Sequence, residues 1–207
     1  MKYRIYLVGL IFLCTQSFAQ QKNNYDAKLE QLLNKMSLED KIGQMTQVTL
    51  AVIAKGGWAN ADGTIDAAAL KEAVQKYKVG SVLNTTAHAF DVATWHKVIK
   101  EIQDETKNTE LKIPVIYGLD AIHGQTYTLN STLFPHNLAM AATRNPALVK
   151  AAAKVTAAEL RASGTRWNFA PVLDLGRQPL WSRFPETYGE DVYIGKVMGV
   201  AAIQGYE

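Results

Sequence analysis

Cysteine is almost absent from this sequence: the 207 residues contain one, Cys14. We expect it to be removed with an N-terminal leader, so that the remaining chain has no disulfide, no thiolate metal site and no cysteine nucleophile. A strong excess of positive or negative charge is also missing, because 22 basic and 19 acidic residues leave a formal net charge of only +3. The sequence therefore gives no indication of nucleic acid or anionic lipid as a partner.

A hydrophobic run long enough to span a membrane is missing as well. The apolar segment Ile5–Leu13 follows two basic residues but is too short to cross a bilayer as a stable helix. Ser17 and Ala19 are small residues separated by one position, which is the pattern that a signal peptidase recognises before its cleavage site. We therefore expect residues 1–19 to be a secretion signal and the protein to be periplasmic or extracellular, without membrane association after cleavage. An uncleaved N-terminal anchor is the less favoured alternative.

Glycine- and serine-rich linkers, repeats and low-complexity segments are also absent. Residues 20–207 are therefore expected to form one domain, or one piece of a domain. That length is short of the ~250 residues typical of a complete eight-stranded α/β barrel. The chain has no Gly-x-Ser-x-Gly elbow for a serine nucleophile, and Gly56-Gly57 lacks the spacing of a phosphate-binding loop.

What the chain does contain is an alternation of short apolar runs and amphipathic helical patterns. The predicted strands are Met45–Ile53, Ser81–Asn84, Ile113–Ile116, Leu138–Ala142 and Trp167–Leu173. The predicted helices are Tyr25–Met36, one that starts at Ser37, Leu70–Tyr77, Val92–Ile102 and one that runs from Asn145-Pro146 to Ser163-Gly164. Strands that alternate with helices pair in parallel through right-handed crossovers. The pattern predicts the N-terminal part of a (β/α)8 TIM-type barrel that ends before the barrel closes, with a doubly wound sheet as the alternative.

Asp120 is the strongest candidate for a functional residue. It follows the apolar run Ile113–Ile116 within Tyr117–Gln125, where Gly118 and Gly124 allow close approach of a ligand. A carboxylate just past a buried parallel strand stands where α/β proteins bind ligands, and it can accept hydrogen bonds from two sugar hydroxyls. The alternative is an aspartate that caps its own loop.

Arg183 and Glu186 form a second candidate pair. The guanidinium group can donate paired hydrogen bonds to a hydroxyl and orient the carboxylate three residues later. As a bare pattern, such a pair is more often found on a protein surface. Asp174 ends a predicted strand and either points into the same site or caps the turn at Gly176.

Histidines and tryptophans offer further candidates. His123 and His136 could hold a metal together with Asp120, which defines a metal-dependent hydrolase as an alternative function. Because no His-Glu-x-x-His helix is present, a structural histidine bonded to the backbone is favoured. Of the four tryptophans, Trp95 has the spacing of a buried helix face, and Trp181 is the candidate for stacking on a sugar.

Two runs together resemble the N-terminal barrel of glycoside hydrolase family 3, which includes many exo-acting β-glucosidases. The first is Gly118-Leu119-Asp120-Ala121-Ile122-His123-Gly124, and the second continues from Arg177 through Trp181-Ser182-Arg183-Phe184-Pro185-Glu186 to Asp191. The resemblance spans about Leu29–Glu207 and departs from the family at Ser182, where glycine is usual.

The resemblance implies a retaining enzyme that removes glucose from the non-reducing ends of β-glucosides and β-linked gluco-oligosaccharides, without a cofactor or a metal. It implies that Asp120 grips the terminal sugar, that Arg183 binds it and that Glu186 supports Arg183. The family's nucleophile and acid/base lie later than Glu207, so no catalytic residue is assigned here, and the chain alone is expected to be inactive and poorly folded. A β-xylosidase, a β-glucan exohydrolase and a non-catalytic truncated product are the alternatives.

Overall fold

The computed structural model describes residues 24–207, so the predicted secretion signal, residues 1–19, lies outside the described residues. The chain divides into two units, residues 1–37 and 38–207. In the first unit the structure describes the helix α2 (Asn24–Lys35), which confirms the first predicted helix. None of the described helices is long and apolar enough to cross a membrane.

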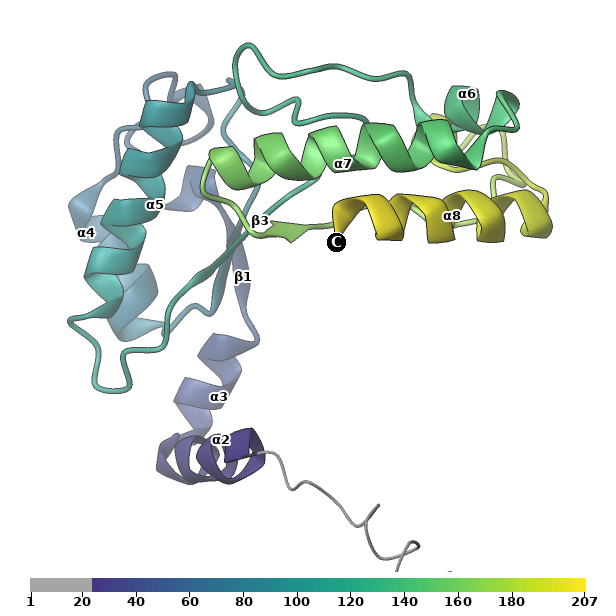
Figure 1. The fold of residues 1–207 in the computed structure, drawn as a ribbon. Coiled ribbons are helices and arrows are strands. Elements are labelled where there is room, and N and C mark those ends of the chain that lie inside the picture. The colour runs from purple at the N-terminus through teal and green to yellow at the C-terminus, as the bar shows by residue number, and fades with distance from the viewer. Residues whose placement is uncertain (1–23) are drawn as a thin grey trace, which may run out of the picture. The chain divides into compact units, whose positions relative to one another are not determined.

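The second unit is built on a four-stranded parallel sheet whose order, β1-β2-β3-β4, follows the chain (Figure 1). Its strands are β1 (Gln47–Thr49), β2 (Ser81–Leu83), β3 (Ile116–Leu119) and β4 (Trp167–Asn168). Each strand pairs in parallel with the next, so every connection crosses back over the sheet. Parallel neighbours in chain order form the wall of an α/β barrel, and the predicted α/β class is confirmed.

Helices and short helical turns connect the strands. They are α3 (Leu38–Gln44), η2 (Leu50–Val52), η3 (Gly57–Ala59), α4 (Ala67–Lys71), η4 (Glu72–Lys76), α5 (Val92–Thr106), α6 (Asn137–Ala142), α7 (Pro146–Ala162), η5 (Phe184–Glu186) and α8 (Val192–Tyr206). Asp91 and Asn145 accept backbone hydrogen bonds at the starts of α5 and α7. The helix start predicted from Asn145-Pro146 is therefore confirmed.

The buried core consists of two apolar clusters. In the first, the fully buried Trp95 donates its indole N–H to the carbonyl of Tyr127 at 3.0 Å. Phe90 and Tyr117 pack edge-on against Trp95, with ring centroids 5.2 and 5.6 Å away, which confirms Trp95 as a core residue. The second cluster joins α6, α7 and α8 and includes Met198.

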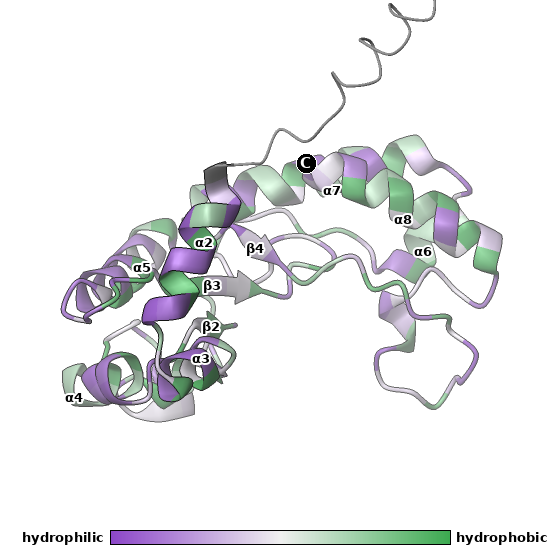
Figure 2. Cartoon of the chain, turned by 90° about the horizontal axis from the view of Figure 1, so that it is seen from below, coloured by the Kyte–Doolittle hydropathy of each residue, from purple (hydrophilic) through white to green (hydrophobic). Residues whose placement is uncertain are grey.

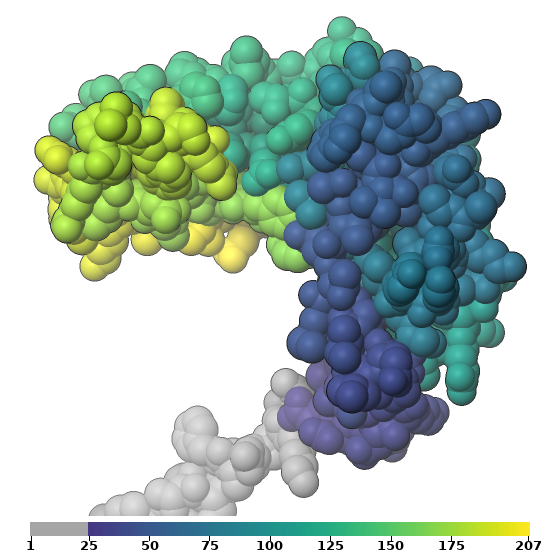
Figure 3. Space-filling model, turned by 180° about the vertical axis from the view of Figure 1, so that it is seen from behind, coloured from purple at the N-terminus to yellow at the C-terminus, as the bar shows by residue number. Residues whose placement is uncertain are grey.

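Helices α7 and α8 lie side by side (Figures 1 and 2), and a glycine allows their close approach. A Cβ atom added at Gly205 would lie 2.7 Å from the Cβ of Ala153. Apolar residues run along α8 (Figure 2). Val192 and Tyr193 are exposed at its start. Among the described residues β1 and β4 each pair with a single strand. In the space-filling view, the C-terminal residues of the second unit (yellow-green) lie on one side of that unit and its N-terminal residues (blue) on the other (Figure 3).

One predicted strand is a helix. Leu138–Ala142 was expected to be the fourth of five strands, but it lies in α6, so the described sheet has four strands. The prediction was wrong because the run consists of leucine, alanine and methionine, which are strong helix formers, and contains no β-branched residue. The carbonyl of His136 accepts hydrogen bonds from the N–H groups of Ala139 and Met140 and closes the first turn.

Other predicted boundaries also differ from the structure. Within the predicted strand Met45–Ile53, only Gln47–Thr49 pairs with a neighbouring strand. The segment leaves the sheet after Thr49 because Ile53 donates its N–H to the carbonyl of Leu50 and closes a local turn. Of Trp167–Leu173 only the first two residues form a strand, and Pro171 has no N–H to continue a ladder. The third strand begins at Ile116 rather than Ile113, and α8 was not predicted.

Candidate functional site

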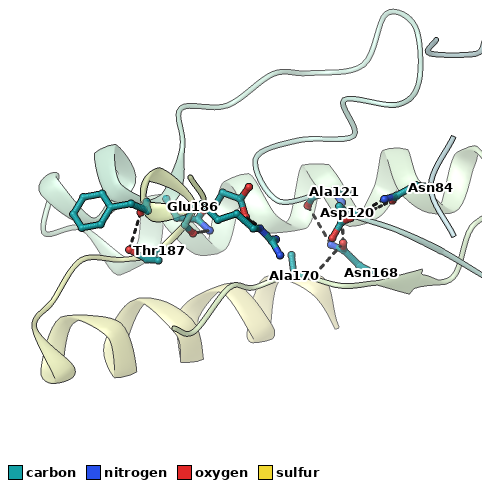
Figure 4. A network of polar contacts seen from close by, with 10 residues as sticks. Asn84, Asp120, Ala121, Asn168, Ala170, Glu186 and Thr187 are labelled. Atoms are coloured by element: carbon teal, nitrogen blue, oxygen red, sulfur yellow. Dashed lines mark hydrogen bonds and ion pairs between the residues drawn. The ribbon is translucent and has the colours of Figure 1, made fainter. Parts of the chain in front are cut away.

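Polar side chains gather where three neighbouring strands end. Asn84 directly follows β2, Asp120 directly follows β3, and Asn168 is the last residue of β4. Because the strands are parallel, these three side chains lie at the same edge of the sheet, with Asp120 between the two amides (Figure 4). This carboxyl edge is where α/β folds place their ligands.

Asn84 holds both the backbone and the carboxylate of Asp120. Its Nδ2 donates to Oδ2 of Asp120 at 2.9 Å, and its Oδ1 accepts the N–H of Asp120 at 3.2 Å. Within residues 24–207, the other oxygen of Asp120, Oδ1, has no hydrogen-bond donor, and the side chain is partly exposed. In the same range no backbone N–H donates to this carboxylate, so its geometry is not that of a loop-capping aspartate.

Asn168 fixes the next peptide from the opposite side (Figure 4). Its Oδ1 accepts the N–H groups of Ala121 at 3.1 Å and Ala170 at 3.3 Å, and its Nδ2 donates to the carbonyl of Ala121 at 3.3 Å. The segment after Asp120 is therefore held by side chains from both flanking strands, and the carboxylate is presented on a fixed backbone.

Arg183 and Glu186 form an ion pair around the short turn η5. Nε of Arg183 donates to Oε2 of Glu186 at 2.7 Å, and Nη2 lies 2.6 Å from the same oxygen. The side chain of Glu186 is only 20% exposed, and its backbone carbonyl accepts a hydrogen bond from Asn137 of α6 at 2.8 Å. The hydrogen bond to Glu186 raises the pKa of Arg183, and the negative charges of Glu186, Asp120 and Asp174 act in the same direction.

Tyr127 links these two parts of the site and was not predicted from the sequence. Burial raises the pKa of Tyr127, and the negative charges of Asp120 and Glu186 raise it further, while Arg183 opposes them. The half-buried ring packs on the core cluster around Trp95. Asp120, Arg183 and Glu186, the three residues predicted to bind substrate, therefore lie in one electrostatic neighbourhood.

The remaining candidates have other surroundings. Nδ1 of His123 lies 2.8 Å from the carbonyl of Phe134, which agrees with a structural histidine, and the ring of His136 lies 4.0 Å from that of His123. No group of three or more histidine, cysteine, aspartate or glutamate residues in the described range is arranged to hold a metal ion. Asp174 is exposed, and Gly176 donates its N–H to a backbone carbonyl, that of Gly189, rather than to Asp174.

Comparison with known proteins identifies the family of this domain. Residues 37–207 match the model of the glycosyl hydrolase family 3 N-terminal domain. A lysosomal β-glucosidase of Dictyostelium discoideum is 39% identical over 191 residues, which cover 88% of this chain and 23% of that protein. A periplasmic β-glucosidase of Salmonella typhimurium is 31% identical over 87% of this chain and 21% of its own length. A putative β-xylosidase of Formosa agariphila is 30% identical over 96% of this chain and 26% of its own length.

Solved structures agree with this result. An exo-1,3/1,4-β-glucanase from a Pseudoalteromonas species superposes with a TM-score of 0.74 and 31% identity, over 90% of this chain and 22% of that chain. The present chain thus spans about a fifth to a quarter of the length of these relatives.

Proposed function

The chain belongs to glycosyl hydrolase family 3 and contains the N-terminal domain of that family. From this premise, we propose that the protein that contains this domain is a retaining β-glucosidase. It would release terminal β-D-glucosyl residues, and the present chain would supply the half of the site that grips the sugar. Asp120 and Arg183 would bind the sugar, and Glu186 would hold Arg183. The observation that carries the proposal is the Asp120 carboxylate, of which one oxygen is held by Asn84 and the other accepts no hydrogen bond within residues 24–207, on a loop that Asn168 fixes and in the same charged neighbourhood as Arg183.

The charges of the site favour a neutral ligand rich in hydroxyl groups. Three carboxylates, those of Asp120, Asp174 and Glu186, surround one guanidinium group, so the neighbourhood is net negative. A phosphate or a carboxylate ligand would be repelled there, whereas sugar hydroxyls can donate to Asp120 and accept from Arg183. Because Glu186 holds the guanidinium group of Arg183 through one hydrogen bond and a second short ion-pair contact, the remaining donors of Arg183 are oriented before a ligand arrives.

The chemical step would use two carboxyl groups that this chain does not provide. Retaining glycosidases form a glycosyl-enzyme intermediate with one carboxylate, while a second carboxyl group first acts as an acid and then as a base. Asp120 and Arg183 would contribute by holding the terminal sugar in one orientation against those groups.

Secretion and substrate choice belong to the same proposal. The leader-like residues 1–19 support export to the periplasm or beyond, and so does the similarity to a relative that is named periplasmic. A β-xylosidase is the second candidate, favoured by the similarity to the Formosa agariphila protein. The two activities differ in whether the terminal sugar carries a hydroxymethyl group.

The test is a rate comparison on the full protein as its gene encodes it. We expect 4-nitrophenyl β-D-glucoside to be hydrolysed faster than the matching β-D-xyloside, and NMR to show the β-anomer of glucose as the first product. Preference for the xyloside would favour the second candidate. Initial release of the α-anomer, or hydrolysis of neither compound, would contradict the proposal.

A further inference from the structure

Within residues 24–207, Asn84 is the residue that donates a hydrogen bond to the carboxylate of Asp120, and nothing in the predicted set of sugar-binding residues accounts for it. One amide group makes two different bonds: its oxygen accepts the N–H of Asp120 at 3.2 Å, and its nitrogen donates to Oδ2 at 2.9 Å. Asparagine is suited to this arrangement because its side chain carries an acceptor and a donor on the same carbon. The two bonds also fix which way the amide faces.

The backbone of Asn84 is held in an uncommon conformation that makes these bonds possible. Its φ of 55° lies in the left-handed region, which asparagine adopts more readily than most residues. The N–H of Asn84 donates to the carbonyl of Gly118 at 2.9 Å, and the hydroxyl of the buried Tyr117 donates to the carbonyl of Asn84 at 2.6 Å. Strand β3 therefore holds Asn84 from both sides of its peptide, next to the carboxylate that Asn84 contacts.

We propose that Asn84 is a positioning residue for substrate binding, which holds Oδ2 of Asp120 so that Oδ1 faces the sugar. This inference rests on the proposed function, in which Asp120 grips the terminal sugar. A neutral donor orients the carboxylate without an opposing charge, so the full negative charge stays available to the hydroxyl groups. A lysine or arginine in the same place would compete with the sugar for that charge.

The ionisable groups around Asp120 and Arg183 come from three further segments. Arg183 and Glu186 belong to the turn η5 and its flank, Tyr127 belongs to the loop after β3, and Asp174 belongs to the loop after β4. Asn84 is uncharged, so a titratable side chain in its place adds one ionisable group to those named above. The pH dependence of substrate binding then reports directly on the contact between residue 84 and Asp120.

The test replaces Asn84 with aspartate in the full protein and follows hydrolysis of 4-nitrophenyl β-D-glucoside from pH 5 to pH 8. When protonated, the introduced carboxyl group donates its O–H to Oδ2 of Asp120, as the amide does. When it releases that proton to solvent, two carboxylates face each other and repel. For Asn84→Asp we expect kcat/KM to approach the parent value at pH 5 and to fall about tenfold or more below it by pH 8, mainly through KM.

Asn145→Asp is the matched control. It adds the same charge at the start of α7, where the side chain caps Leu148 and where aspartate caps as well as asparagine. We expect its pH profile to follow that of the parent. A purely structural role of Asn84 would lower the amount of folded protein and leave KM and the pH profile unchanged, so a parallel profile for Asn84→Asp would overturn the inference.

A second variant keeps the test decisive if Asn84→Asp does not fold. Asn84→Gly tolerates a positive φ and removes the amide, so it should retain the fold and lose about tenfold or more in kcat/KM at every pH. Parent-like kinetics of Asn84→Gly would refute the inference. Asp120→Asn distinguishes a failure of this inference from a failure of the proposed function. If Asp120→Asn has parent-like kinetics, Asp120 does not grip the sugar. If Asp120→Asn loses most of its kcat/KM while both Asn84 variants have parent-like kinetics, only the positioning role of Asn84 is refuted.

Discussion

Replacing Asp120 with asparagine tests the gripping role with little change in shape. Nδ2 of Asn84 lies 2.9 Å from Oδ2 of Asp120, so the introduced amide keeps this bond by placing its oxygen there. Its NH2 group then stands where Oδ1 was, and a donor replaces the charged acceptor that faces the sugar. The substitution therefore changes the ligand side of the residue and preserves the side that contacts the protein.

The size of the effect follows from the number of bonds. A hydrogen bond to a charged group is worth about 1.5–3 kcal/mol, so weakening two of them costs roughly 3 kcal/mol, or about 150-fold in kcat/KM. The assay is steady-state hydrolysis of 4-nitrophenyl β-D-glucoside by the full protein, with thermal unfolding measured on the same sample. We expect the large kinetic loss to come with a nearly unchanged melting temperature, because the contact with Asn84 survives.

Asp91→Asn is the matched control, since it removes one carboxylate at the start of α5, where the side chain accepts the N–H of Thr94 at 2.7 Å. Its kinetics should equal those of the parent. If Asp120→Asn stays within about threefold of the parent, the energetic argument above fails. An equal loss in both variants would show that the effect comes from net charge and not from a contact with the sugar.

Three further predictions concern the arginine and two glycines. Arg183→Lys should lose nearly as much kcat/KM as Arg183→Ala, because an ammonium group cannot make both short contacts to Glu186; near-normal kinetics of the lysine variant would mean that only the positive charge matters. Gly118→Ala should lower the free energy of unfolding in urea by about 1–3 kcal/mol, since the added Cβ would lie 2.7 Å from a ring atom of Phe169, and an unchanged midpoint would contradict this packing. Gly205→Ala should destabilise by a similar ~1–3 kcal/mol because it forces α8 away from α7, and a parent-like urea midpoint would show that the two helices can separate without cost.

The features that the sequence predicts well depend on neighbouring residues. The start of α7 follows from an asparagine cap and a proline in the first turn, and the structure confirms both. Asp120 was placed at a strand end because a β-branched run precedes it and glycines flank it, and the strand does end at Leu119. The failure at Leu138–Ala142 has the same basis, because a short apolar run does not distinguish a buried strand from one turn of helix.

The features that the sequence did not predict depend on residues far apart in the chain. Asn84 and Asp120 are separated by 36 positions, and no local pattern indicates that the amide of one holds the carboxylate of the other. The register supplies the missing information: Leu83 pairs with Gly118, so the residue after β2 lies beside the end of β3. Tyr127 was missed for a similar reason, because its position depends on how the loop after β3 folds back onto the core.

The two amides that flank Asp120 differ in what they hold. The side chain of Asn168 bonds to backbone atoms of Ala121 and Ala170, so it fixes the path of the loop, and it also interacts with the side chain of Tyr206. Asn84 bonds to one backbone atom and to one carboxylate oxygen, so it also fixes the direction in which the charge points. A loop that needed only a fixed shape would be satisfied by the first kind of contact. The second kind restrains a torsion of the Asp120 side chain and leaves its Oδ1 without a donor within residues 24–207, as the proposed positioning role of Asn84 requires.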